Sequence, residues 1–213
     1  MQHITKDTVV VQEVSEGEFT WDFSVQEHAR LVLVFSISAN KAITVIPSVH
    51  LVGRGSSAQI LGIVRGTHSA KITIHTLQHH AAPETTSDLL IKSVLMNESS
   101  CFYDGSITVD PVAQKTDAYQ RNENLLLDTG AKATSSPALE ILANDVRCTH
   151  GAVVKTIDQN ELWYCMSRGI SETTARNLIA NGFIMSTLDR ISDSELQAKI
   201  KTQLIPEEGN LWK

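Results

Sequence analysis

Hydrophobic and polar residues alternate in several short stretches of the first two thirds of the chain. Residues 71–75 and 106–110 place apolar side chains on one face and polar side chains on the other, which is the period of a half-buried strand. Turn-rich segments at 53–57 and 130–132 punctuate the pattern. Strands are therefore predicted at 31–38, 49–52, 58–64, 71–77, 89–95, 101–109, 124–127 and 138–142.

Two all-β architectures fit this spacing, a sandwich and a parallel solenoid, because both use short strands at intervals of roughly ten to twenty residues. No strict internal repeat is visible. The aromatic content is 5%, which favours the thin aliphatic core of a solenoid. The first forty residues are harder to read, with strand-like segments at 8–11 and 19–23 between acidic turns.

The pattern becomes helical after Thr156. Asp158 and Glu161 have the spacing of a capping box, in which each side chain bonds a free backbone N–H at the start of a helix, and Gly169 supplies a left-handed stop. The chain is therefore predicted to have a β domain over 1–156 and a small helical domain over 157–213.

Two further helices are expected in the C-terminal domain. One begins at the Ser171 cap and ends at 181–182, and its apolar stripe consists of Ala175, Leu178 and Ile179. The other begins at Ser192, with Glu195 at the capping-box position, and ends before Pro206.

Charge and hydropathy exclude several classes of partner. The 213 residues are 42% hydrophobic and carry a formal net charge of −6, with Lys and Arg scattered, so neither nucleic acid nor a membrane surface is an expected partner. Lys6 is followed by Glu13, Glu16 and Glu18, which is not the charge order of a signal peptide. A cytoplasmic location is expected.

Three cysteines, Cys101, Cys148 and Cys165, are too few and too widely spaced for a disulfide framework or a CxxC metal site. Each taken alone is best interpreted as a small, buried, free thiol. Cys101 lies in a predicted strand and Cys165 in a predicted helix, where core packing is the expected environment.

Several separated motifs resemble the SufB/SufD family of the SUF iron–sulfur cluster assembly system. The longest is Pro-Ala-Leu-Glu-Ile-Leu-Ala-Asn-Asp-Val-Arg-Cys-Thr-His-Gly-Ala at 137–152, and chance agreement over that length is very improbable. The others are His-Leu-Val-Gly at 50–53, His-His-Ala-Ala-Pro-Glu-Thr-Thr-Ser at 79–87, Gln-Lys-Thr-Asp-Ala at 114–118, Asn-Leu-Leu-Leu at 124–127 and Leu-Trp-Tyr-Cys-Met-Ser-Arg-Gly-Ile at 162–170.

Within the family the Cys-Thr-His-Gly tetrad at 148–151 is similar to SufD, whereas Tyr164-Cys165 is closer to SufB. SufD-like is the better description. The cysteine that SufB proteins carry ahead of the strand at 125–127 is replaced by Arg121-Asn122-Glu123. Compared with the family, the chain is expected to lack the N-terminal helical region and several early coils.

The resemblance implies a mainly β fold, a right-handed parallel β-helix followed by a small helical domain. It also implies a scaffold subunit rather than an enzyme, which pairs with a SufB-like or identical chain and docks a SufC-like ABC ATPase. No Gly-x-x-x-x-Gly-Lys phosphate loop occurs, so ATP hydrolysis falls to the partner. A transient iron–sulfur cluster would be shared with a partner chain, and no cofactor would be bound permanently.

Cys148 and His150 are the foremost site candidates. They are two residues apart in an extended segment, so their side chains leave on the same face, and thiolate and imidazole are both suitable cluster ligands. Lys115, Asp117 and Cys165 are weaker candidates; Lys115 and Asp117 also fit an ion-paired turn between coils. His75, His79 and His80 are interpreted as a surface turn, in which at most His75 and His79 share a side.

Trp163, Tyr164, Arg168 and Ile170 are the candidates for docking the ATPase, because large aromatic and Arg side chains are enriched at interface hot spots. Trp163 fits a core position equally well. Two alternatives to the scaffold remain. One is a metal-free structural β-helix adaptor, and the other is a thiol-dependent enzyme with Cys148 as nucleophile and His150 as base.

Overall fold

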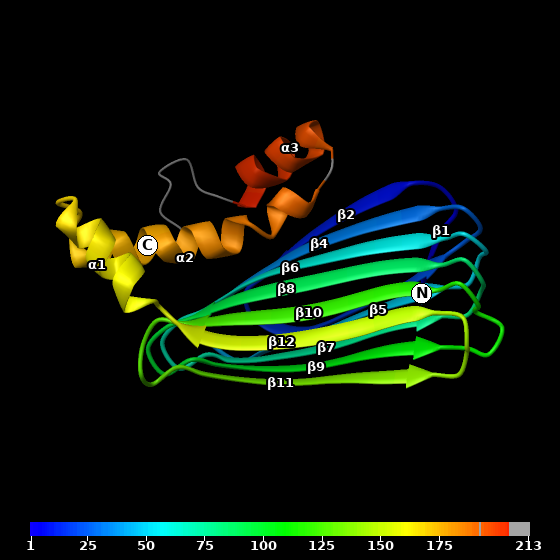
Figure 1. Cartoon of the computed structure of the whole chain (residues 1–213), viewed down its shortest axis with the longest axis horizontal. Helices are drawn as coiled ribbons and strands as arrows, with labels where there is room; N and C mark the ends of the chain where they lie inside the picture. The colour runs from blue at the N-terminus through cyan, green and yellow to red at the C-terminus, as the bar shows by residue number, and fades with distance from the viewer. Residues whose placement is uncertain (192, 205–213) are drawn as a thin grey trace.

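Two six-stranded parallel sheets face each other in the computed structural model of the chain, which describes residues 1–191 and 193–204 (Figure 1). Successive strands alternate between the sheets, so that each strand pairs with the strand two places along the chain. Sheet A contains β1 (Gln2–Ile4), β3 (Gly17–Val25), β5 (Ile43–Leu51), β7 (Lys71–His80), β9 (Ser100–Val109) and β11 (Lys132–Ile141). Sheet B contains β2 (Thr8–Val14), β4 (Arg30–Ala39), β6 (Ser57–Gly66), β8 (Thr86–Leu95), β10 (Asp117–Leu126) and β12 (Arg147–Thr156).

This arrangement is a parallel β-solenoid, and it confirms the prediction of stacked parallel strands over 49–143. Paired residues in neighbouring coils are close to thirty positions apart, as in His50 and His79, which are separated by 29. A sandwich of antiparallel strands is excluded because every pairing between the described strands is parallel. The sequence prediction missed β1, gave β12 only as an extended segment at Cys148 and His150, and made most strands too short.

The main core lies between the two sheets and is formed by the inward residue of each alternating pair. In β7, for example, Ile72 and Ile74 are buried while Thr73 and His75 are partly exposed. The first coils fill the interior mostly with aliphatic side chains and Phe35, stacked in columns by the parallel register. Such stacking buries each side chain against its equivalent in the next coil.

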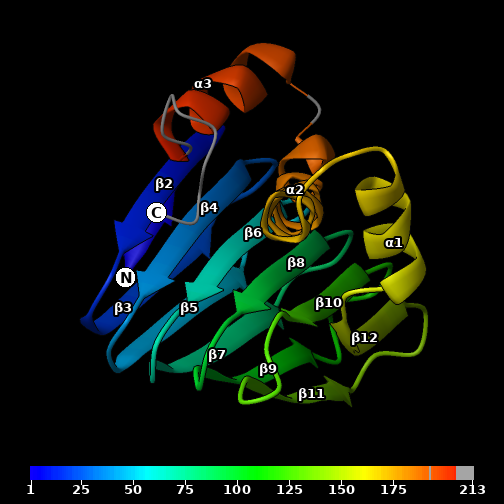
Figure 2. The same ribbon diagram turned by 90° about the vertical axis from the view of Figure 1, so that its left-hand side faces the viewer.

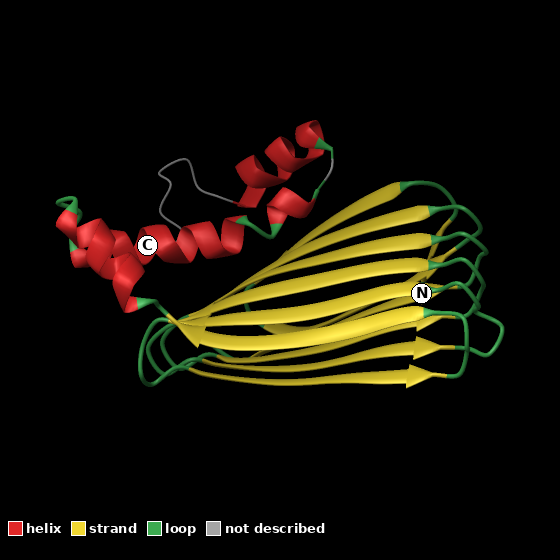
Figure 3. Cartoon of the chain, in the orientation of Figure 1, coloured by secondary structure: helices red, strands yellow, loops and turns green. Residues whose placement is uncertain are grey.

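A second core lies between the outer face of sheet B and the C-terminal helices, α1 (Gln159–Ser167), α2 (Glu172–Met185), the short 3₁₀ helix η1 (Leu188–Arg190) and α3 (Ser194–Leu204). Figure 2 views α2 nearly end-on above β6 and β8, with α3 toward β2 and α1 toward β12. A strand that is covered on both faces has consecutive apolar residues instead of alternating ones, as in residues 31–35 of β4. Figure 3 shows that the helices gather on this one side of the strands.

A left-handed residue recurs in the turn that precedes β4, β6, β8 and β10. These residues are His28, Gly55, Glu84 and Lys115, with φ between 55° and 68°. Each backbone N–H donates to a carbonyl in the turn of the next coil, for example Glu84 to Gln114 and Lys115 to Asp145. The turns therefore stack in register with the strands. Only one of these four residues, Gly55, is a glycine, the residue type that adopts a positive φ most readily.

The predicted start of the C-terminal helices is confirmed. The Asp158 side chain accepts from the Asn160 N–H, Gly169 has φ +85°, and the Ser171 side chain accepts from the Thr174 N–H. The predicted end of α2 is wrong, because the helix continues through Gly182 to Met185. Ile184 is buried against the second core, and this packing outweighs the weak helix propensity of glycine.

Two details of the helical stripe and cap also differ from expectation. Ala175 is buried as predicted and Ile179 is partly buried, whereas Leu178 is 57% exposed. The Asp193 side chain accepts from the Glu195 and Leu196 N–H groups at the start of α3. The predicted Ser192 cap and the stop before Pro206 lie outside the described residues. No helix in the described ranges is long and apolar enough to cross a membrane.

Gly62 provides a test of the packing between coils. A Cβ at this inward position would lie 2.6 Å from Phe35 Cζ and 2.9 Å from Ile91 Cγ1, in the coils on either side. We expect Gly62→Ala to lower the free energy of unfolding by about 1–3 kcal/mol through overpacking, as measured by urea denaturation. The control Gly182→Ala meets nothing within 4 Å and should instead stabilise by up to about 1 kcal/mol. Equal stabilities for the two variants would contradict this account of the core.

His80 makes the stability depend on pH. It is buried between Thr85 and Ser87, whose hydroxyls lie 2.8 Å from its two ring nitrogens. Burial, and then the nearby charge of His79, lowers its pKa from 6.5 to about 4. Above pH 6.5 the His80 imidazole is neutral in both the folded and the unfolded state. Between pH 6.5 and about pH 4 it takes up a proton only in the unfolded state, so the free energy of unfolding falls progressively over this range.

The loss attributable to His80 should be about 3 kcal/mol between pH 7 and pH 4. His80→Gln should remove this part of the pH dependence, measured by urea denaturation across that range in chelator-containing buffer. His28→Gln, at an exposed turn, should leave the dependence unchanged. If His80→Gln retains the full slope, the buried imidazole is not its source.

Candidate interface at the open end of the solenoid

The last coil, formed by β11 and β12, is paired on only one side. β11 bonds to β9 and β12 to β10, and no strand of the described chain covers their outer edges. This coil also exposes apolar side chains, namely Ile141, Leu142, Val153 and Val154. Unpaired strand edges with exposed apolar residues are a ready surface for another chain, so this end is the first candidate for an interface.

The interior becomes polar as it approaches the open end. One inward column runs through Leu33, Ile60 and Leu89, continues with Gln120 in β10 and ends at His150 in β12. The neighbouring inward residues of β10 are Asn122 and Asn124. All three β10 amides are essentially inaccessible to solvent. The polar interior therefore lies directly beneath the exposed last coil.

These buried amides differ in how well they are satisfied. Asn122 Oδ1 accepts from Asn124 Nδ2 at 2.7 Å and from the Ser135 hydroxyl. By contrast, neither the oxygen nor the nitrogen of the Gln120 amide has a hydrogen-bond partner within the described chain. An unsatisfied buried polar group costs about 1–3 kcal/mol. Gln120, directly below His150, thus has donor and acceptor capacity to spare for a further polar group.

Cys148 and His150 lie in this last coil, as inward residues of β12. Their paired neighbours are Ala118 and Gln120. Cys148 is half-buried against the small core at this end, and His150 is exposed because no further coil covers it. Within the described residues no group of three or more His, Cys, Asp or Glu side chains is arranged to hold a metal ion. This end therefore offers one thiol and one imidazole as candidate metal donors, which is fewer than a complete ligand set.

The three thiols have different environments. Cys101 is buried, and burial raises its pKa to about 12; Cys165 is half-buried against the core beneath the helices. Burial also raises the pKa of Cys148, and the Asp117 carboxylate raises it further, against a backbone hydrogen bond from Ala118 that lowers it. A thiol with a raised pKa is a poor nucleophile at neutral pH, which argues against a thiol-dependent enzyme.

Lys115 and Asp117 belong to the turn and strand framework. Lys115 is the left-handed residue of its turn, and its ammonium lies 3.9 Å from Glu84. Asp117 begins β10 and accepts two hydrogen bonds from the guanidinium of Arg147 on β12. Neither side chain joins Cys148 and His150 on the inward face. Lys115 lies in the turn before β10, and Asp117 pairs with Arg147 on the outward face of sheet B.

The ATPase-docking candidates separate into exposed and packed residues. Trp163 is 71% and Tyr164 57% exposed, so the core interpretation of Trp163 is wrong. Arg168 stacks on the Tyr164 ring at 5.3 Å. Ile170 packs partly against the second core. Leu178 on α2 adds an exposed apolar side chain that the sequence prediction had placed inside.

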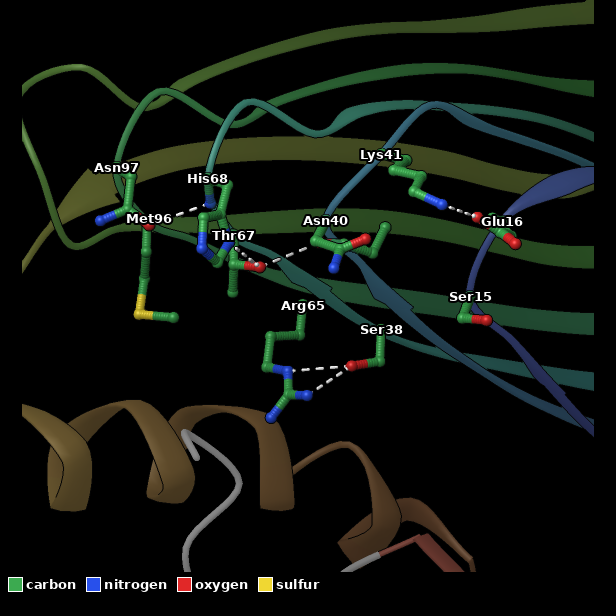
Figure 4. A pocket seen from close by; sticks show the side chains of 11 residues that line it. Ser15, Glu16, Ser38, Asn40, Lys41, Arg65, Thr67, His68, Met96 and Asn97 are labelled. Atoms are coloured by element: carbon green, nitrogen blue, oxygen red, sulfur yellow. Dashed lines mark hydrogen bonds and ion pairs between the residues drawn. The ribbon is translucent and has the colours of Figure 1, made fainter.

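A separate hollow of about 630 Å³ lies at the turns of sheet B on the side of α2 (Figure 4). Its charged side chains are engaged: Lys41 Nζ is 2.7 Å from Glu16 Oε2, and Arg65 donates to the Ser38 hydroxyl. It contains neither Cys148 nor His150. We therefore place the candidate site at the open end rather than in this hollow.

The sequence prediction missed the polar column at Gln120, Asn122 and Asn124. A signal was present in the sequence, because these three amide residues occupy alternate positions, as residues on one face of a strand do. It was misread because only 124–127 was taken as strand, whereas β10 begins at Asp117.

Comparison with known proteins gives a consistent result. A SufBD family protein of Synechocystis is 31% identical over 138 residues, which is 65% of this chain and 29% of that protein. SufD of Escherichia coli is 29% identical over 74% of this chain and 37% of its own length. A SufBD family protein of Mycobacterium leprae is 28% identical over 75% of this chain and 43% of its own length.

The chain thus spans less than half the length of these relatives. The family model described as the SufBD core domain of SUF-system iron–sulfur cluster assembly matches residues 8–183, from the second strand of the solenoid to near the end of α2. That match extends well beyond half of the chain and includes the open end, so the protein belongs to the SufBD core-domain family.

Proposed function

We propose that the chain is a SufD-like subunit of the SUF iron–sulfur cluster assembly scaffold. The observation that carries the proposal is the position of Cys148 and His150, on the inward face of a last coil whose outer edge no described strand covers. In this proposal a SufB/SufD-type chain abuts the open end and completes the ligand set for a nascent cluster. The names of the relatives, SufD and SufBD family proteins, support the same assignment.

The chemistry expected of the site follows from its donors. Thiolate sulfur and imidazole nitrogen both ligate iron in clusters, and two donors from one chain need others to complete the coordination. The unsatisfied Gln120 amide lies in the column below His150 and can hydrogen-bond to a polar atom of the cargo or of its ligands. The cluster is cargo here, held until transfer.

The C-terminal helices are proposed to dock a SufC-like ABC ATPase through exposed side chains of α1. Trp163, Tyr164 and Arg168 form the proposed contact, and a large exposed tryptophan is the kind of residue that dominates interface energetics. The helices cover apolar residues of sheet B, including Val32, Leu61 and Leu90. Removing residues 158–213 would uncover this face, so point substitutions test the docking more cleanly than a deletion.

We expect His150→Ala to leave the fold intact, since the side chain is exposed, and to reduce cluster formation with a SufB-type partner. Loss of even an outer-shell contact typically costs about tenfold, so loss of a ligand should cost at least ~10-fold. Anaerobic reconstitution with iron and sulfide, followed by visible absorption, measures the effect. The matched control is Thr149→Ala, an exposed neighbour on the opposite face of β12.

Normal cluster yield in His150→Ala, with pairing retained, would favour the metal-free adaptor instead. Loss of pairing as well as of cluster would indicate that His150 acts in the contact between chains.

We expect Trp163→Ser combined with Tyr164→Ser to weaken binding of a SufC-type ATPase by at least ~10-fold, the effect of losing a hot spot. Titration calorimetry with the purified ATPase provides the measurement. The control is Val112→Ser, which removes an apolar side chain of similar exposure, 65%, from a turn of the solenoid. Unchanged affinity in the double variant, with its helical content retained, would remove α1 from the docking surface.

A further inference from the structure

Four ionisable side chains form a row on the outer face of sheet A. His50 of β5 and His79 of β7 are paired residues in adjacent coils, and their Nδ1 atoms are 3.1 Å apart. His79 Nε2 lies 3.2 Å from Asp110 Oδ1, and His50 Nε2 lies 3.3 Å from Asp22 Oδ1. The two rings are perpendicular, at 89°. The histidines thus belong to strands, not to the surface turn expected from the sequence.

The carboxylates determine which nitrogens carry protons. A carboxylate only accepts, so its favourable partner is an N–H, and His79 Nε2 donates to Asp110. The Asp22 oxygen nearest His50 is buried and has no hydrogen-bond donor in the described chain, although His50 Nε2 is within ion-pair distance. A proton on His50 Nε2 is therefore the favourable arrangement there as well.

With both Nε2 atoms protonated, the two neutral imidazoles direct Nδ1 lone pairs at each other across 3.1 Å. Two lone pairs at this separation repel unless a cation lies between them. Either a shared proton or a metal ion satisfies the pair. A carboxylate behind each ring is the usual second-shell arrangement of a histidine that ligates metal.

We propose that His50 and His79 form a binding site for a divalent transition-metal ion of the Zn²⁺ type, coordinated by the two Nδ1 atoms. An ion about 2.0–2.1 Å from each nitrogen would subtend an angle of about 100° at this separation, between the octahedral and tetrahedral values. Asp110 orients the His79 ring through its hydrogen bond, and Asp22 places a carboxylate 3.3 Å from His50 Nε2. Since the described residues provide no third protein ligand, water completes the coordination.

The site is open to solvent and independent of the proposed scaffold function. The side chains of His50 and His79 are 21% and 27% exposed, so an ion can enter while the rings stay packed. It lies on the outer face of sheet A, whereas Cys148 and His150 face the interior from sheet B. A metal ion and a proton compete for the same Nδ1 lone pairs, so the ion binds to the imidazoles in their neutral form.

His75 provides a matched comparison on the same face. Its Nδ1 lies 3.3 Å from Asp104 Oδ2, so it has a carboxylate partner like that of His79, but Phe102 rather than a second imidazole packs against its ring. A lone imidazole lacks the paired donors of the proposed site.

The test is Zn²⁺ titration by calorimetry of the full chain carrying Cys148→Ser and His150→Ala, which removes the two candidate ligands at the open end. We expect one Zn²⁺ per chain. His50→Ala or His79→Ala should weaken binding at least ~10-fold, and Asp110→Asn about 10-fold. His75→Ala should leave the affinity unchanged.

A second measurement avoids reliance on variants that fold poorly. In the ¹⁵N-histidine-labelled chain, Zn²⁺ should shift the Nδ1 signals of His50 and His79 and leave those of His75 unmoved. The proposal is overturned if the unsubstituted pair binds Zn²⁺ no more tightly than the double alanine variant. It is equally overturned if the two Nδ1 signals do not respond at saturating Zn²⁺, which would leave a shared proton as the sole occupant.

Discussion

The backbone hydrogen bonds between successive coils determine the rest of this structure. Each strand pairs in parallel with the strand one coil away, so every inward or outward residue lies against its equivalent about thirty positions along the chain. Even the connecting turns follow this register through the N–H of a left-handed residue. Side chains are therefore arranged in columns, and the chemistry of a column depends on residues far apart in sequence.

The columns explain how one continuous fold has an apolar interior in its early coils and a polar interior near its open end. Where the columns are apolar, as around Phe35 and Ile91, they form a close-packed core in which Gly62 leaves no room for a Cβ. Toward the last coils the same positions become amides, and the column ends in His150. The stacking that stabilises the early coils thus also holds polar groups at the open end, where the Gln120 amide has no hydrogen-bond partner in the described chain and His150 is exposed.

The two faces of the sheets serve different purposes. The outer face of sheet B is covered by α2 and its neighbours, which bury Val34, Leu61 and Val94 and leave Trp163 and Tyr164 outside. None of the described helices lies over the outer face of sheet A, and there the register brings His50 and His79 together. The inward face provides the candidate cluster ligands. Each surface is generated by the same parallel pairing.

The sequence by itself determined the local features of this protein. Alternation identified most strands, side-chain caps identified the starts of α1 and α2, and the motif around Cys148 and His150 indicated the family. These features depend on neighbours a few residues away, which a single sequence displays directly.

Only the tertiary structure decided which residues meet across coils. Gln120 lies under His150 and His50 faces His79 because of a pairing offset near thirty, which varies from coil to coil and leaves no strict repeat to read. Packing likewise decided that α2 continues through Gly182, that Leu178 points outward and that Lys115 adopts a left-handed turn. In each case the free energy gained from burial or backbone pairing with a distant segment outweighs the conformation that the residue and its sequence neighbours favour. The position of that distant segment is determined only when the coils stack.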